Sequence, residues 1–418
     1  MLSLAPLIAV GLSALAGSDT TRTRWTMAEY LAVVDAAHPE LIVARERARA
    51  AEARIGPARR PPDPMVELGI MNRSLPGLGR SSPVAMDQIR FSQVVPIPGR
   101  LGAATDAARE RAAAESGMAD ETRSQVRWRA ATTLIELDRL DRTRAQVLAL
   151  RPSLEALQEV ARARYAAGQA DHADVIMAQL EAARLGEELV MLETDRGMAV
   201  ARLNAMALRP PTARIDTVVV PAPPDSLPPL EQLLSRADAD RPLLTSRRAA
   251  LNAARFERRR AAVERWPDLE VGVVYGQQPM AGGGTDRMVS LMVGASLPIW
   301  SGSRQRQMRQ EAEAMERMTA ADLTAAQAET GARLAELEAE FAGARQLETL
   351  YRGTLVPQGR AAAASALAGY RTGSVSFETA LSSQLAVARA ELELVGFSAR
   401  RARIAAEVEY LVAEGALR

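Results

Sequence analysis

Residues 269–276 read Leu-Glu-Val-Gly-Val-Val-Tyr-Gly, and residues 288–297 read Met-Val-Ser-Leu-Met-Val-Gly-Ala-Ser-Leu. In both stretches large apolar side chains alternate with mostly small or polar ones. This period of two predicts strands with two different faces, because successive side chains of a strand point to opposite sides. The glycine-rich turn at residues 282–284 joins the two stretches into a strand pair. An apolar face opposite a small or polar face is also typical of strands in a membrane barrel.

The first half of the chain repeats the plan of the second half. Five landmarks recur in the same order and at a nearly constant spacing, which chance does not explain. They are His38-Pro39 and Arg241-Pro242, Glu67-Leu68-Gly69 and Glu270-Val271-Gly272, Pro96-Ile97 and Pro298-Ile299, Pro152 and Pro357, and Tyr165 to Gly168 and Tyr370 to Gly373. Each half is therefore expected to contain a helix, a strand pair and a long helical hairpin.

The expected boundaries follow from this duplication. Residues 1–16 are expected to be a signal peptide, because an apolar stretch ends there in the small-residue site Ala14-Leu15-Ala16. The remaining parts are a first repeat half (17–208), a Pro-rich linker (209–229) and a second repeat half (230–418). Helices are expected over 27–55 and 230–265, strands over 64–72, 85–96, 267–277 and 287–298, and hairpin tips at 165–174 and 370–379.

The two hairpins contain very long helices. Pro152 is the only proline in residues 99–166, and Pro357 is the only proline in residues 302–368. At ~1.5 Å per residue, a helix of this length measures roughly 100 Å. Because apolar residues recur at three- and four-residue steps, such rods must pack on one another as in a coiled coil.

The composition limits the function further. The chain has 418 residues, 4% aromatic residues and a net charge of +1, so charge alone does not indicate nucleic-acid binding. It has no cysteine, which excludes disulfides, cysteine metal sites and a thiol nucleophile. No apolar run reaches the ~18–20 residues of a membrane-spanning helix, so any crossing of a membrane must use strands.

Four strands per chain imply an assembly. The smallest membrane barrels need about eight strands, and an open sheet edge is not tolerated in lipid. Several copies must therefore pool their strands. This argument leaves two, three or four copies open.

Two motifs carry a resemblance to a known family. Residues 165–179 and 370–384 both begin with Tyr-x-x-Gly and have a glutamine at their last position. The strand-to-helix turns Val-Pro-Ile-Pro-Gly-Arg (95–100) and Leu-Pro-Ile-Trp-Ser-Gly (297–302) also match. In these features the chain resembles the TolC family of outer-membrane efflux proteins, over essentially its whole length after the signal peptide.

The resemblance implies a mainly α fold with a membrane β-barrel part. Four strands per protomer would be pooled into a trimeric twelve-strand barrel, and a long coiled-coil α-helical tunnel would extend into the periplasm. The implied function is the outer-membrane exit duct of a tripartite efflux system, which passively conducts substrates such as heavy metals or drugs. The implied partners are two further copies of the chain, a periplasmic adaptor (membrane fusion) protein, an inner-membrane pump of RND or ABC type, and outer-membrane lipid, with no nucleic acid.

The resemblance also implies two groups of site residues. At the periplasmic tip, where the tunnel closes and the adaptor docks, these are Tyr165, Gly168, Asp174, Tyr370, Gly373 and Glu378. At the strand-to-helix turns they are Pro96, Pro98, Gly99, Pro298 and Gly302. Val375 stands where the family has a basic residue, and Thr379 and Ser382 stand where it has acidic ones. An acidic ring that selects cations is therefore not carried over to this chain.

Each tip residue also has a purely structural interpretation. Gly168 and Gly373 suit the positive φ of a helix C-cap. Asp174 suits a helix N-terminus, where the dipole stabilises negative charge. The tyrosines suit packing. For Gly168 and Gly373 we expect both interpretations to hold, so that each glycine caps a helix and also forms part of the tip.

Other functions compete with the exit duct. An outer-membrane component of type I protein secretion would share this architecture. A soluble coiled-coil scaffold would explain the helices, but not the alternating strands or the duplication. Catalysis and a cofactor are not expected, because GxSxG, P-loop, HExxH and GxGxxG motifs are absent.

A metal site is not expected either. His172 has no second ligand at metal spacing. Met280, Met288 and Met292 cluster near one strand pair, and thioethers suit soft metals. We interpret these methionines as packing residues, and passage of a soft metal is the alternative.

Overall fold

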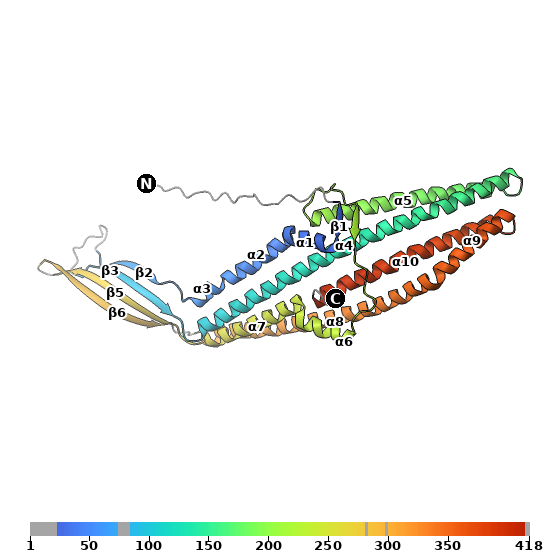
Figure 1. Cartoon of the computed structure of the whole chain (residues 1–418). Coiled ribbons are helices and arrows are strands. Elements are labelled where there is room, and N and C mark those ends of the chain that lie inside the picture. Colours follow the sequence, from blue (N-terminus) through green and yellow to red (C-terminus); the bar gives the residue numbers. More distant parts are fainter. Residues whose placement is uncertain (1–22, 74–83, 281–282, 297–299, 414–418) are drawn as a thin grey trace, which may run out of the picture. The chain divides into compact units, whose positions relative to one another are not determined.

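The computed structural model describes residues 23–73, 84–280, 283–296 and 300–413, so the expected signal peptide and Pro298 lie outside the described residues. The structure is mainly helical with a few strands, which confirms the predicted fold class. None of the helices in these ranges is both long enough and apolar enough to cross a lipid bilayer. In chain order the elements in Figure 1 are β1 (Arg24–Thr26), α1 (Met27–Ala37), α2 (Pro39–Ala53), α3 (Ile55–Arg59), β2 (Met65–Met71), β3 (Met86–Val95), α4 (Arg100–Ala166), α5 (His172–Met206), β4 (Thr217–Val219), α6 (Leu230–Asp240), α7 (Pro242–Val263), β5 (Leu269–Pro279), β6 (Thr285–Ala295), the π-helix η1 (Ser301–Gln305), α8 (Arg306–Leu350), the π-helix η2 (Tyr351–Leu355), α9 (Val356–Thr372) and α10 (Phe377–Val412).

The chain forms two compact units, and each unit takes segments from both sequence halves. Among the described residues, unit 1 comprises Thr23–Ile42, Thr122–Arg241 and Glu329–Ala413. Unit 2 comprises Val43–Glu121 and Pro242–Ala328. The strand pairs lie in unit 2, and both hairpin tips lie in unit 1.

Proline divides the first helix of each half. The break falls at His38 between α1 and α2, and at Arg241 between α6 and α7. Both residues have extended backbone, with ψ of 125° and 121°. Pro39 and Pro242 follow them, and proline disfavours helical backbone in the residue before it. The expectation of one continuous helix over each region is therefore wrong.

Unit 2 contains a four-stranded antiparallel sheet in the order β2-β3-β5-β6. Strands occur in all four predicted regions, although β6 ends at Ala295 and β5 reaches Pro279. The central pair joins the two halves of the sequence, since β3 belongs to the first half and β5 to the second. Strands β2 and β6 form the two edges of the sheet.

One face of the sheet is apolar across all four strands. Val66 pairs with Phe91, which pairs with Val273. Val273 in turn pairs with Leu291 on β6. We call this side the apolar face, and its large apolar members are Val66, Leu68, Ile70, Ile89, Phe91, Val271, Val273, Tyr275, Val289, Leu291 and Val293. The same register also places the polar residues Asp87, Gln93, Gln277 and Arg287 on this side. The side chains of Val289 and Leu291 are each 73% exposed, so the described chain leaves this face largely uncovered.

The opposite side of the sheet, which we call the second face, carries glycines, polar residues and methionines. Its members are Met65, Glu67, Gly69, Met71, Met86, Gln88, Arg90, Ser92, Glu270, Gly272, Val274, Gly276, Met288, Ser290, Met292 and Gly294. Glu67 and Arg90 form an ion pair at 3.3 Å. A Cβ on Gly272 would lie 3.2 Å from the carbonyl oxygen of Phe91, so glycine permits a close approach of the strands here.

Unit 1 is held by two apolar cores. The larger runs along the hairpin of α4 and α5 and includes Leu134, Leu137, Leu140 and Leu203, at the spacing of a buried helix face. The smaller joins α6, α8 and α10 through Leu233, Leu334, Leu337, Phe341 and Val408. A short parallel pair of β1 with β4 is also present, and it was not expected from the sequence.

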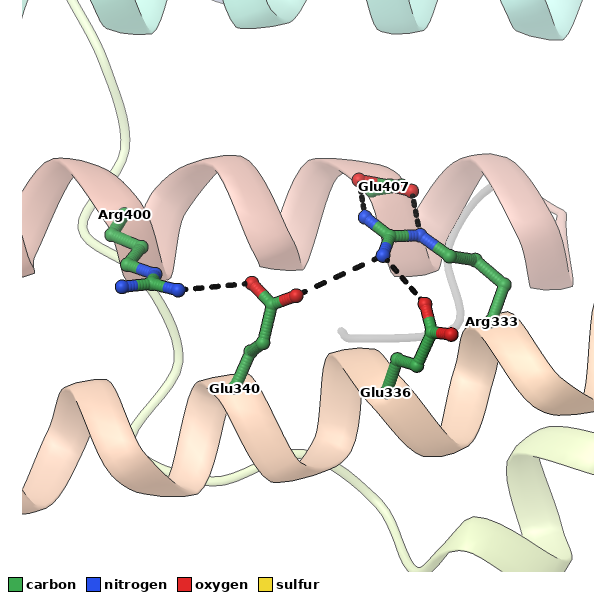
Figure 2. A network of polar contacts seen from close by, with 5 residues as sticks. All are labelled: Arg333, Glu336, Glu340, Arg400 and Glu407. Atoms are coloured by element: carbon green, nitrogen blue, oxygen red, sulfur yellow. Dashed lines mark hydrogen bonds and ion pairs between the residues drawn. The ribbon is translucent and has the colours of Figure 1, made fainter.

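A network of ion pairs joins α8 to α10 in unit 1 (Figure 2). Arg333 donates from Nε and Nη2 to the two carboxylate oxygens of Glu407, at 2.6 and 3.0 Å. Arg333 Nη1 donates to Glu336 at 2.9 Å, and Arg400 lies 3.4 Å from Glu340. The hydrogen bonds to Glu407 and Glu336 raise the pKa of Arg333. This network fixes the two helices beside the smaller core.

Candidate functional site

Each helical hairpin turns at a glycine with positive φ. Gly168 has φ +71° and Gly373 has φ +84°, the region in which glycine avoids the steric penalty of a side chain. The amide of Gln169 donates to the carbonyl of Arg164 at 2.8 Å, and the amide of Ser374 donates to that of Gly369 at 2.9 Å. These six-residue closures are the hydrogen bonds of a glycine C-cap, so both glycines end a helix as expected.

Tyr370 is buried at the tip. Its side chain is 2% exposed, and its ring packs edge-to-face on Phe377 with a centroid distance of 5.6 Å. Both residues belong to the larger core of unit 1, together with Val175 from the first hairpin. The two hairpin tips of one chain therefore share a packed apolar cluster.

A polar contact joins the two tips above this packing. The Tyr370 hydroxyl donates a hydrogen bond to Asp174 Oδ2 at 3.2 Å. Asp174 lies in the first turn of α5, where the helix dipole stabilises its negative charge. Burial, followed by the neighbouring charge of Asp174 and the hydrogen bond to it, raises the pKa of Tyr370 to about 12. The phenol is therefore neutral and remains a donor at physiological pH.

Arg164 completes the group, which we call the tip cluster: Arg164, Asp174, Tyr370 and Phe377. The guanidinium carbon of Arg164 lies 4.8 Å from the centroid of the Tyr370 ring. Its Nη1 donates to the Tyr370 carbonyl oxygen, and its Nη2 donates to the Gln169 carbonyl oxygen at 3.0 Å. One arginine thus binds the backbone of both turns.

Arg164 is not among the site residues predicted from the sequence. The family pattern has a basic residue two positions after Gly373, and Val375 stands there in this chain. The structure supplies the cation from the first hairpin instead. A Cβ on Gly373 would lie 3.2 Å from Arg164 Nη2, so this glycine also makes room for the guanidinium. The only sequence signal is the position of Arg164, next to the first Tyr-x-x-Gly motif.

Two predicted tip residues lie outside the tip cluster. Tyr165 is 47% exposed, and its ring lies 5.2 Å from that of His172. Glu378 is exposed in the first turn of α10. The equivalent tyrosines of the two motifs therefore have different environments, one buried and one on the surface.

The strand-to-helix turns lie in unit 2. Gly99 has φ +91° between β3 and α4, after Pro96 and Pro98. Arg100 then forms an ion pair with Asp268, which precedes β5. Gly302 lies in the π-helix η1. The first of these turns is thus tied to the second half of the chain.

The tip cluster offers hydrogen bonds and packing. Among the described residues no group of three histidine, cysteine, aspartate or glutamate side chains could hold a metal ion. What the geometry provides is a packed and hydrogen-bonded contact between the two hairpin tips.

Comparison with solved structures gives the fold. The chain is similar to the outer membrane protein VceC from Vibrio cholerae, at 18% identity and a TM-score of 0.79, over 93% of this chain and 96% of that one. It is similar to CusC, described in terms of transmembrane channel formation, at 12% identity and a TM-score of 0.80, over 93% and 92%. It is also similar to the open state of the MtrE outer membrane channel from Neisseria gonorrhoeae, at 15% identity and a TM-score of 0.73, over 93% and 89%.

These likenesses show that the chain has the fold of these outer-membrane proteins. A comparison with curated protein sequences gives no match. Residues 233–413, which cover most of the second half, match the family model described as outer membrane efflux protein. The predicted resemblance to the TolC family of outer-membrane efflux proteins is thereby confirmed.

Proposed function

We propose that three copies of this chain form the exit duct of a tripartite efflux system in the outer membrane. The observation that carries the proposal is the sheet of unit 2, with an uncovered apolar face and two free edges. The duct conducts substrates passively, after an inner-membrane pump of RND or ABC type and a periplasmic adaptor have delivered them.

The sheet supports an assembly for a physical reason. Strands β2 and β6 are its edges, and unpaired backbone groups in lipid each cost several kcal/mol. Pairing β6 of one copy with β2 of the next removes every edge once the ring closes. Three copies bring twelve strands into one closed sheet, whose apolar face then contacts lipid and whose second face lines the interior.

The hairpin tips support a closing device. Each chain has two tips, and the tip cluster holds them together through Tyr370, Asp174 and Arg164. Three chains bring six tips around one axis, where bulky side chains narrow the passage. In this proposal the exposed residues Tyr165 and Glu378 are available to the adaptor, while the tip cluster sets how firmly the tips stay closed.

The assembly is tested by mass and conductance. The full chain, purified in detergent, is expected to have the mass of a trimer by light scattering after subtraction of the bound detergent. The same sample is expected to form discrete conductance steps in a planar lipid bilayer. A folded monomer that does not conduct would overturn the proposal and favour the soluble scaffold.

A further inference from the structure

The methionines of the sheet are segregated to one side. The four strands contain five methionines, and all of them lie on the second face: Met65, Met71, Met86, Met288 and Met292. The large apolar side chains of the apolar face are instead valine, leucine, isoleucine, phenylalanine and tyrosine. Methionine is compatible with lipid, so apolarity alone would place it on both faces. Something other than apolarity therefore distinguishes the second face.

Register pairs and one close contact connect three of these methionines, which lie on β2, β3 and β6. Met71 pairs directly with Met86 on the next strand. The sulfur of Met86 lies 3.0 Å from the position that a Cβ of Gly276 would take, so it covers this glycine. Gly276 in turn pairs with Met288 on β6. Directly opposite Cβ positions are about 5 Å apart, so flexible side chains from β2, β3 and β6 can reach one shared space.

The other two thioethers lie on the edge strands at one common level. Met65 pairs with Ser92, and Ser92 pairs with Gly272. Gly272 pairs with Met292 on the opposite edge. Since β2 and β6 are the strands that meet between neighbouring copies in the proposed ring, Met65 and Met292 both belong to that seam. Along the strands, Met65 and Met292 thus lie on one side of the Glu67–Arg90 ion pair, and Met71, Met86 and Met288 lie on the other side.

We propose that the second face is a weak binding surface for soft monovalent metal cations, Cu(I) or Ag(I), which move along it from thioether to thioether. The inference rests on the proposed function, because only a closed ring makes the second face the wall of a conduit. Thioether sulfur is a soft ligand that selects Cu(I) over hard cations. The second face contains no histidine and no cysteine, so it binds weakly, as a conducting path requires.

Binding is tested on the full chain with Ag(I) as the probe. Silver nitrate in a chloride-free buffer is titrated into the detergent-solubilised protein by calorimetry, and X-ray absorption identifies sulfur ligands. The sheet variant is Met71→Leu/Met86→Leu/Met288→Leu, which keeps volume and apolarity but removes sulfur. The matched control is Met177→Leu/Met315→Leu/Met318→Leu, which replaces exposed methionines on α5 and α8. We expect about a tenfold or greater loss of Ag(I) affinity in the sheet variant, equivalent to about 1.4 kcal/mol, and no loss in the control.

Conductance separates this inference from the proposed function. In a planar bilayer with potassium nitrate, Ag(I) is expected to reduce the wild-type current reversibly and to leave the sheet variant unaffected. A wild-type channel that conducts, but responds to Ag(I) just as the sheet variant does, would overturn the thioether surface and leave the exit duct standing. If an apolar organic cation blocks both the wild type and the sheet variant while Ag(I) affects neither, the second face acts through its apolarity. That result would also overturn the thioether surface. A wild-type chain that fails to conduct would remove the exit duct, and equal Ag(I) affinities of wild type and sheet variant would remove the inference independently.

Discussion

The hydroxyl of Tyr370 and the carboxylate of Asp174 form a hydrogen bond of 3.2 Å across 196 residues of sequence. The bond connects the second hairpin to the first at the point where both reverse direction. It can be broken by a substitution that keeps the aromatic ring in the core. The proposed role of this bond in closing the tip can therefore be tested by removing a single oxygen atom.

Tyr370→Phe is expected to loosen the closed tip. The change removes the hydroxyl but keeps the packing on Phe377, so the loss is that of one hydrogen bond to a charged group, about 1.5–3 kcal/mol. In planar bilayers the variant should show a higher single-channel conductance or open probability than wild type. Tyr165→Phe is the control, because Tyr165 lies outside the tip cluster, and it should conduct like wild type. If both variants behave like wild type, the narrowest point lies elsewhere.

Alkaline pH is expected to destabilise the tip through the same residue. The pKa of Tyr370 is raised to about 12 in the folded chain, against an ordinary value of 10. A raised pKa means that the neutral form is favoured by folding, so its contribution is complete below pH 10 and is lost as the pH rises toward 12. The free energy of unfolding should fall over this window, and less steeply in Tyr370→Phe.

The composition of the chain simplifies the measurement of unfolding free energy against pH. The chain contains no lysine, so no ammonium side chain loses its proton over this window. Buried Tyr30 also has a raised pKa and contributes with the same sign, so the informative quantity is the difference between wild type and Tyr370→Phe. Identical pH profiles of the two proteins would contradict the assignment.

Gly373→Ala is expected to be more harmful than Gly168→Ala. Both glycines have positive φ, which costs other residues roughly 1–2 kcal/mol. A Cβ at Gly373 would also crowd Arg164 Nη2, whereas nothing lies within 4 Å of one at Gly168. Thermal unfolding and binding of a purified adaptor measure the two effects. Gly353→Ala on η2 is the control without positive φ or a close neighbour, and equal losses at the two caps would refute the role of Arg164.

Leu291→Arg is expected to impair assembly more than Ser290→Arg. Leu291 lies on the apolar face and Ser290 on the second face, at adjacent positions of β6. An arginine facing lipid near the bilayer midplane costs about 2–4 kcal/mol, whereas one facing the interior meets water. Heat-modified gel migration of membrane extracts reports the trimer. The reverse order of severity would mean that the two faces have been exchanged.

The strands and the long helices could be predicted because their signals are local. The alternation of apolar with small or polar residues in β5 and β6 can be recognised without knowing what packs on the sheet. The long helix is indicated because residues 99–166 contain only one proline. The pairing of β1 with β4 could not be predicted, since three residues are too few to show a period. The breaks at His38 and Arg241 could have been predicted from the prolines that follow them.

The tip shows where sequence reasoning reaches its limit. Tyr165 and Tyr370 occupy the same place in the same motif, yet one is 47% exposed and the other 2%. Their difference comes from neighbours on other helices, above all Arg164 and Phe377, and no local pattern encodes it. For the same reason the cation of the tip cluster could not be assigned from the second motif alone.

The pairing of β3 with β5 has a consequence for how the chain is made. During synthesis from the N-terminus, β2 and β3 are complete well before Leu269 is added to the chain. Likewise, 168 residues of sequence separate Arg100 from its ion-pair partner Asp268. Throughout that interval β3 presents a free hydrogen-bonding edge. A finished β5 from a neighbouring chain offers the same partner sequence, so intramolecular and intermolecular closure compete. Slow synthesis at high local concentration should therefore yield chains with exchanged halves, and dilution should restore correctly closed ones.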